Sequence, residues 1–107
     1  MNQFVVRPAL DGSGRLILEF RGDHRAEGFP SVMSILDRQL SGFMASGSEP
    51  APDDFLWVCS YLGGSFEISD DWCGLFILPR SHHAVVLVDV TAALVASGVF
   101  ERVASNG

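Results

Sequence analysis

Residues 55 to 79 constrain the fold more than any other part of the chain, because they contain three mostly apolar runs at short, regular spacing. The runs are FLWVCSYL, SFEIS and WCGLFIL, and they are separated by Gly63-Gly64 and by Asp70-Asp71. Pairs of this kind form two-residue turns between antiparallel strands. The sequence therefore predicts a meander of antiparallel strands over this stretch.

The predicted turns determine which residues lie opposite one another. Leu62 pairs with Ser65 across the first turn, and Ser69 pairs with Trp72 across the second. Because side chains alternate between the two faces of a sheet, this register predicts a core face made of Phe55, Trp57, Cys59, Tyr61, Phe66, Ile68, Cys73, Leu75 and Ile77. The opposite face has a polar centre of Ser60, Ser65, Glu67, Ser69 and Gly74 between apolar ends formed by Leu56, Val58, Leu62, Trp72, Phe76 and Leu78. Either a second helix covers those ends or the face is open to a partner.

The same register places both cysteines on the core face but two strands apart. Cys59 lies opposite Ile68, which lies opposite Cys73, so the two sulfur atoms are about 10 Å apart. A disulfide needs a much shorter separation. We therefore predict two free thiols, with Cys73 buried in the core, where desolvation makes a thiol unreactive.

A hairpin is predicted at the start of the chain. The apolar runs at 3–7 and 15–21 flank the turn-forming tetrapeptide Asp11–Gly14. The second run alternates apolar and charged residues, which is typical of a strand with one solvated face.

A long helix is predicted after a polar loop. Apolar residues recur at helical spacing, at Val32, Ile35, Leu36, Leu40, Phe43 and Met44. Ser31 can cap the first turn, and Gly42 or Gly47 can end the helix. The tract at 46–54, rich in Ser, Pro and Asp, is then predicted to be a linker.

The C-terminal segment allows two interpretations. The run Ala84 to Val88 is rich in valine and suits a buried strand, followed by a short helix that starts at Asp89 or Thr91. A continuous helix from Ser81 to Ser97 is the alternative. An edge strand over Val99 to Val103 can follow in either case.

Together these elements predict one small globular domain over residues 1–107, in the α+β class. The expected order is ββαββββα, in which a hairpin, a long helix, a meander of three to four strands and a short C-terminal helix form a mostly antiparallel sheet with a helix packed on one face. A chain of 107 residues with 48% hydrophobic residues can bury a core of its own.

The net charge of −6 is confined to one segment. Residues 1–38 carry five Arg and five acids, and residues 80–107 carry two of each, so both parts are neutral. No basic residue lies between Arg38 and Arg80, whereas six acids do: Glu49, Asp53, Asp54, Glu67, Asp70 and Asp71. This distribution disfavours nucleic acid and anionic membranes as ligands and favours a cationic partner.

Composition excludes several activities. All seven basic residues are Arg, so Schiff-base chemistry and a P-loop lysine are excluded. The glycines form no dinucleotide-binding motif, and we predict no cofactor. With no secretory signal and no membrane-length apolar stretch, we expect a cytoplasmic protein whose cysteines are reduced.

A metal site or a reactive thiol is conceivable around Asp70, Asp71, Cys73, His82 and His83, which supply the right atom types within 14 positions. Their spacing matches no zinc motif, and adjacent histidines on a strand point to opposite sides. In a meander the two acids and the histidines also start from opposite ends of the sheet. We therefore predict no metal site and no Cys–His nucleophile.

Two other titratable residues have simple interpretations. Glu67 is predicted to lie mid-strand between Ser60 and Gly74, where it could serve as a general acid or base. The same position suits an ordinary solvent-facing residue, which we favour. His24 is predicted to be an ordinary loop residue.

The sequence favours a non-enzymatic interaction or regulatory module of bacterial, cytoplasmic type, active as a monomer or a weak homodimer. Its predicted partner is a cationic protein, and its predicted binding residues are Glu49, Asp53, Asp54, Glu67, Asp70, Asp71 and Trp72. The alternative is a small enzyme or a ligand- or metal-binding domain that uses Glu67 or the neighbourhood of Asp70, Asp71, Cys73 and His82.

Overall fold

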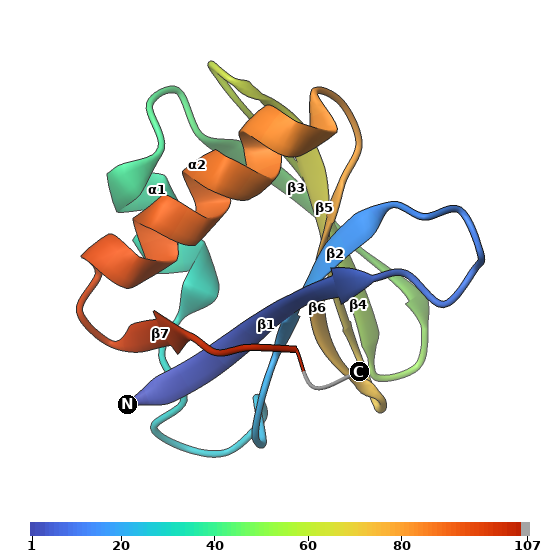
Figure 1. The fold of residues 1–107 in the computed structure, drawn as a ribbon. Coiled ribbons are helices and arrows are strands. Elements are labelled where there is room, and N and C mark those ends of the chain that lie inside the picture. The colour runs from blue at the N-terminus through green and yellow to red at the C-terminus, as the bar shows by residue number, and fades with distance from the viewer. Residues whose placement is uncertain (106–107) are drawn as a thin grey trace.

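The computed structural model describes residues 1–105, in which two helices and seven strands form a mixed sheet with its helices on one side (Figure 1). The strands are β1 (Asn2–Pro8), β2 (Leu16–Phe20), β3 (Met44–Ala51), β4 (Asp54–Tyr61), β5 (Gly64–Asp71), β6 (Gly74–Pro79) and β7 (Phe100–Arg102). The helices are α1 (Val32–Gln39) and α2 (His83–Ala96). The α+β class is as predicted.

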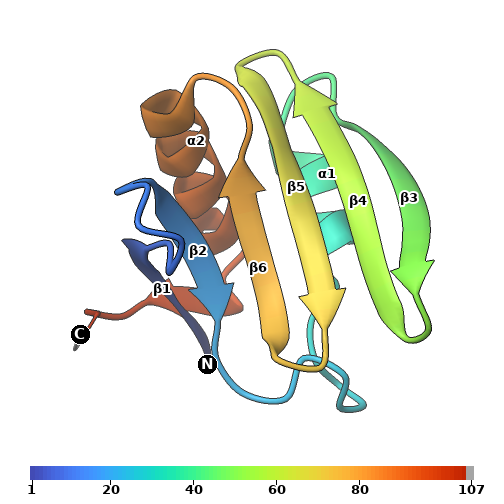
Figure 2. The ribbon, with the colours of Figure 1, turned by 90° about the vertical axis from the view of Figure 1, so that its right-hand side faces the viewer.

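The strand order across the sheet is β3-β4-β5-β6-β2-β1-β7. All neighbouring strands are antiparallel except β1 and β7, which are parallel, so the sheet is mixed with antiparallel pairs dominating. Helix α1 carries the chain from β2 to one edge strand, β3, and α2 carries it from β6 to the other, β7. Both helices lie on the same side of the sheet, and neither covers the opposite face (Figure 2). We call that uncovered side the open face.

The predicted hairpin is confirmed as β1 and β2. The side chain of Asp11 accepts a hydrogen bond from the backbone N–H of Ser13 at 2.9 Å, which fixes the connecting loop. Gly12 and Gly14 both have a positive φ, a conformation in which a side chain would be strained. The turn chemistry of the tetrapeptide Asp11–Gly14 was therefore a reliable signal.

The core lies between the two helices and the sheet. Its fully buried side chains include Phe4, Leu18, Cys59, Phe66, Ile77 and Phe100 from the strands, and Leu36, Val86, Val90 and Leu94 from the helices. A close approach brings α2 onto the sheet at Gly64, where an added Cβ would lie only 2.8 Å from a methyl group of Val86. The absence of a side chain at Gly64 thus allows α2 to pack directly against β5.

The prediction of a long first helix was wrong, because α1 ends at Gln39. Leu40 caps it with its backbone N–H bonded to the carbonyl of Leu36, and Gly42 turns the chain with a φ of +73°. Phe43 still packs on the core, against Phe66 at 6.3 Å between ring centroids. Phe43 therefore lies at helical spacing although it is outside the helix, and this is why the spacing of apolar residues predicted too long a helix.

The predicted linker at 46–54 is instead most of β3, the turn after it and the start of β4. The small residues of β3 pair with β4, with Gly47 opposite Trp57. The register shifts between Ser48 and Ala51, around Pro50, as is common in edge strands. The composition of this segment is typical of a linker, but its backbone pairs with β4 and forms a strand.

The meander is present, but both predicted turns were misplaced. The first turn is Leu62-Gly63, and Cys59 lies opposite Phe66, two residues from the predicted register. The second is Trp72-Cys73, and Ile68 lies opposite Ile77, four residues away. Both shifts are even numbers of residues, so the assignment of side chains to faces survived.

Cys73 is the main exception to the predicted faces. It lies exposed in the second turn, whereas Cys59 is fully buried in the core. The prediction of two free cysteines is confirmed, but the burial of Cys73 is not. Phe55, also assigned to the core face, is 38% exposed at the end of β4.

The C-terminal segment forms the second of the two predicted alternatives, one continuous helix, followed by a short strand. Val86, Leu87, Val90, Ala93 and Leu94 are buried at the spacing of a helix. The valine-rich run at 84–88 favours a strand locally, but packing of this face on the sheet outweighs that preference. No helix among residues 1–105 is long and apolar enough to cross a membrane.

Candidate functional site

Two turns and one loop meet at a single end of the sheet, which we call the turn end (Figure 2). They are the β3–β4 turn at Pro52 and Asp53, the β5–β6 turn at Trp72 and Cys73, and the loop at 21–30 that follows β2. Strands β4 and β5 are neighbours, with Phe55 opposite Asp70. The topology therefore brings together most of the acidic segment and a loop from the first third of the chain.

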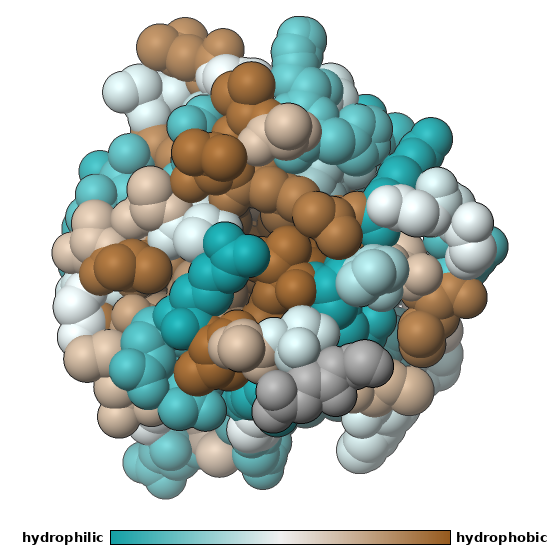
Figure 3. Space-filling view, in the orientation of Figure 1, coloured by the Kyte–Doolittle hydropathy of each residue, from teal (hydrophilic) through white to brown (hydrophobic). Residues whose placement is uncertain are grey.

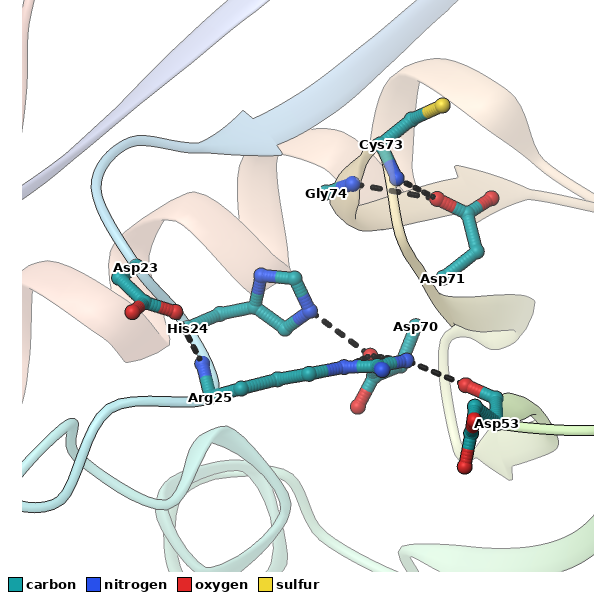
Figure 4. A network of polar contacts seen from close by, with 8 residues as sticks. All are labelled: Asp23, His24, Arg25, Asp53, Asp70, Asp71, Cys73 and Gly74. Atoms are coloured by element: carbon teal, nitrogen blue, oxygen red, sulfur yellow. Dashed lines mark hydrogen bonds and ion pairs between the residues drawn. The ribbon is translucent and has the colours of Figure 1, made fainter.

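Asp70 is the centre of a polar network at the turn end (Figure 4). Its Oδ1 lies 2.7 Å from Nε2 of His24, 3.1 Å from Nε of Arg25 and 3.0 Å from an Nη of Arg25. Arg25 also donates a hydrogen bond to the backbone carbonyl of Asp53. The charge of Asp70 is thus balanced within the chain, by a residue 45 positions away in the sequence.

Arg25 also contacts the exposed tryptophan of the β5–β6 turn. Its guanidinium carbon lies 5.1 Å from the centre of the Trp72 ring, within the range of a cation–π interaction. The side chain of Asp23 accepts a hydrogen bond from the backbone N–H of Arg25 at 3.1 Å, which holds the loop in place. Trp72 nevertheless remains 76% exposed.

Asp71 fixes the turn that presents Trp72. Its Oδ1 accepts hydrogen bonds from the backbone N–H groups of Cys73 at 2.7 Å and of Gly74 at 3.1 Å. An aspartate that bonds the backbone two and three residues ahead stabilises a turn locally. This contact explains why the turn forms two residues later than the Asp70-Asp71 pair suggested.

The predicted binding residues separate into two groups. Asp53, Asp54, Asp71 and Trp72 lie at the turn end, and Glu49 lies nearby on β3. None of the four acids among these forms an ion pair with another residue of 1–105. Asp70 lies with them but is paired, as described above.

Glu67 lies away from this group, on the open face. It is opposite Val58 and Leu78, not Ser60 and Gly74 as the predicted register had it. Its carboxylate lies 3.5 Å from Nε of Arg80. Leu78 occupies the space that a glycine would have left, so the environment expected for an acid–base residue is not formed.

The residues considered for metal binding are not brought together. His82 precedes α2 and lies at the opposite end of β6 from Asp71 and Cys73. Among residues 1–105 no group of three or more His, Cys, Asp or Glu side chains is arranged to hold a metal ion.

A pocket of about 300 Å³ adjoins the Asp70 network on the helix side of the sheet. Its walls include Phe29, Val32, Met33, Trp57, Ile68 and Leu75, and its polar side is formed by His24 and Asp70. Trp57 lies across Gly47, where an added Cβ would be 2.8 Å from the indole nitrogen, and stacks on Phe55 with ring centroids 6.0 Å apart. The aromatic wall formed by Trp57 therefore packs against the backbone of β3.

Two titratable groups elsewhere have raised pKa values. Burial raises the pKa of the Cys59 thiol to about 12. Burial is the main cause that raises the pKa of Tyr61 above its ordinary value, and a 2.6 Å hydrogen bond to Asp89 raises it further. The Tyr61–Asp89 bond joins β4 to α2, so both effects belong to the packing of the core and not to the turn end.

Comparison of the chain with known protein families, with curated proteins and with solved structures found no match. The site is therefore defined by its own geometry.

Sequence reasoning missed Arg25 and His24. The surplus of acids between residues 38 and 80 was a signal that some cation would be recruited from outside that segment. Nothing local distinguished Arg25 from the other arginines of the N-terminal part, because its partners become neighbours only when the sheet forms.

Proposed function

We propose that this protein is a non-enzymatic interaction module that binds a cationic segment of a partner protein at the turn end. The observation that supports it most is an exposed Trp72 at the same end of the sheet as carboxylates that form no ion pair within residues 1–105. Asp53, Asp54 and Asp71 supply negative charge, and a tryptophan ring attracts a guanidinium or ammonium group.

Arg25 indicates how such a cation would be held. Its guanidinium is bound by an aromatic face, a carboxylate and a backbone carbonyl at the same time. A partner arginine would meet the same kinds of group on the exposed side of Trp72. Because the binding groups are exposed, the association would be fast and sensitive to salt.

The proposal extends to the state and location of the protein. We expect a monomer or a weak homodimer in the cytoplasm, in keeping with its free thiols. The surface best suited to self-association is the outer side of α2, where apolar side chains gather in Figure 3. Val88 and Val95 are 67% and 49% exposed there, beside a groove of about 540 Å³ that also includes Leu16.

The experiment is affinity capture from a lysate of the source cells, with a charge variant and a matched control. The variant is Asp53→Asn/Asp54→Asn/Asp71→Asn. Asparagine tolerates the φ of +64° at position 53, and its Oδ1 can still accept the two hydrogen bonds of position 71. The fold should therefore be kept while three charges are removed.

The control removes three charges away from the turn end, as Asp11→Asn/Asp37→Asn/Glu101→Gln, and the asparagine at position 11 can still accept the hydrogen bond from Ser13. We expect wild type and control to capture the same partner at low salt and to release it at high salt, whereas the turn-end variant captures none. If the two triple variants behave alike, or if no salt-sensitive partner is captured at all, the proposal is wrong.

A further inference from the structure

The pocket beside the Asp70 network has walls that suit a flat apolar ring. Trp57 and Phe29 provide aromatic surface, and Val32, Ile68 and Leu75 close the remaining sides. These side chains come from β4, β5, β6, the loop at 21–30 and α1. The pocket is thus built from five segments that the core already holds in place.

The polar side of the pocket has hydrogen-bond acceptors but few donors. Asp70 is a carboxylate whose Oδ1 is fixed by Arg25, so His24 must donate its Nε2–H to it. In neutral His24 the other ring nitrogen, Nδ1, can then only accept. This nitrogen points away from Asp70 in Figure 4. The His24 side chain itself is only 9% exposed.

The volume limits the size of a ligand. A cavity of roughly 150 Å³ holds benzene, and pockets of drug-sized ligands begin near 300 Å³. The pocket here, at about 300 Å³, therefore fits one or two fused rings and not an extended molecule.

We propose that this pocket binds a small planar aromatic molecule that donates one hydrogen bond to Nδ1 of His24. Indole-like and phenol-like compounds have this chemistry. The site is distinct from the surface of Trp72 and the exposed carboxylates that is proposed to bind a partner protein.

The test uses two probes that differ in a single donor, indole and 1-methylindole, titrated at pH 8. Binding is followed by the NMR signals of the two tryptophan side-chain N–H groups, because Trp57 lines the pocket and Trp72 does not. We expect indole to move the Trp57 signal with a dissociation constant of about 1 mM or tighter. The Trp72 signal should stay in place, and 1-methylindole should bind about fivefold more weakly, the effect of one net hydrogen bond.

Two variants locate the contact. His24→Phe keeps an aromatic ring but removes the acceptor, so the preference for indole over 1-methylindole should disappear, whereas His82→Ala should leave it unchanged. Met33→Phe narrows the pocket and should weaken both probes, whereas Leu62→Phe, at an exposed turn, should weaken neither.

The wild-type comparison alone can overturn the proposal, even if a variant fails to fold. The proposal is wrong if Trp57 does not respond to indole up to about 10 mM, or if the two probes bind equally. A preference for indole that persists in His24→Phe would also overturn it. None of these results bears on the capture of a cationic partner, so the two proposals can fail separately.

Discussion

A single side chain, Arg25, joins the three segments of the turn end. Arg25 connects the loop after β2 to both turns, through Asp70, the carbonyl of Asp53 and the ring of Trp72. Each contact is of modest strength, because Arg25 is partly exposed. Their combination at one side chain makes Arg25 the residue whose loss should be felt most at this end.

Replacing Arg25 with alanine should lower the free energy of unfolding by about 1 kcal/mol, the sum expected for a part-exposed ion pair and a cation–π contact. The measurement is urea denaturation of wild type and variant. Arg38→Ala is the matched control, since Arg38 is exposed on α1 and forms no ion pair within residues 1–105. A variant as stable as this control would show that the network adds nothing to stability.

Alkaline pH should destabilise the protein through Cys59. Its pKa is about 12 in the folded state, above the ordinary thiol value, so between about pH 9 and 12 only the unfolded chain has lost the proton. Stability is therefore complete below this window and falls as pH rises through it, by at most about 1.4 kcal/mol per pH unit for one group. The raised pKa of Tyr61 acts in the same direction.

Denaturation of Cys59→Ala between pH 8 and 11 should give a shallower fall than wild type. Cys73→Ala, which removes an exposed thiol, is the control and should keep the wild-type slope. Equal slopes for wild type and Cys59→Ala would refute this assignment.

At the scale of elements, the sequence predicted the parts that local chemistry controls. The hairpin followed from its turn residues and was found as predicted. The faces of the meander strands followed from alternation and, Cys73 apart, were found as predicted although both turns were misplaced. The length of α1, the pairing of β3 and the continuity of α2 depend on contacts that form only in the fold. Phe43 and Gly47 illustrate this, because each owes its role to a partner on another element.

Gly47→Ala tests whether β3 supports the aromatic wall. The new Cβ would lie 2.8 Å from the indole nitrogen of Trp57, so the ring must shift. We expect a loss of about 1–2 kcal/mol in unfolding free energy and an altered near-ultraviolet circular dichroism spectrum. Ser46→Ala, on the same exposed strand, should change neither. A Gly47→Ala protein with wild-type stability and spectrum would show that Trp57 does not rest on β3.

The outer side of α2 should control self-association. Val88→Asp places a charge on its exposed apolar surface and should weaken any homodimer at least tenfold, or about 1.4 kcal/mol. Val58→Asp, a valine 41% exposed on the open face, is the matched control. Sedimentation equilibrium is the measurement, and a wild-type dimer should tighten with salt, because each copy carries a charge of −6. Association that persists in Val88→Asp would place the interface elsewhere.

At the scale of the whole molecule, the charge distribution and the topology act together. The sequence located the negative charge in one segment, and the fold divides that segment: Glu67 pairs with Arg80 on the open face, and Asp70 pairs with Arg25 at the turn end. The other four carboxylates of the segment form no ion pair within residues 1–105, and they lie at the turn end or beside it on β3. Sequence reasoning could identify the acids but not which of them the chain itself would neutralise, because ion pairing at long range depends on strand order.

The most direct test of the proposed function is the salt dependence of binding between the purified protein and its captured partner, measured by calorimetry. For wild type, affinity should fall steadily with rising salt. For Asp53→Asn/Asp54→Asn/Asp71→Asn, it should be at least about tenfold weaker at low salt and nearly independent of salt. An affinity that this variant retains in full, with the wild-type salt dependence, would contradict binding of a cationic partner at the turn end.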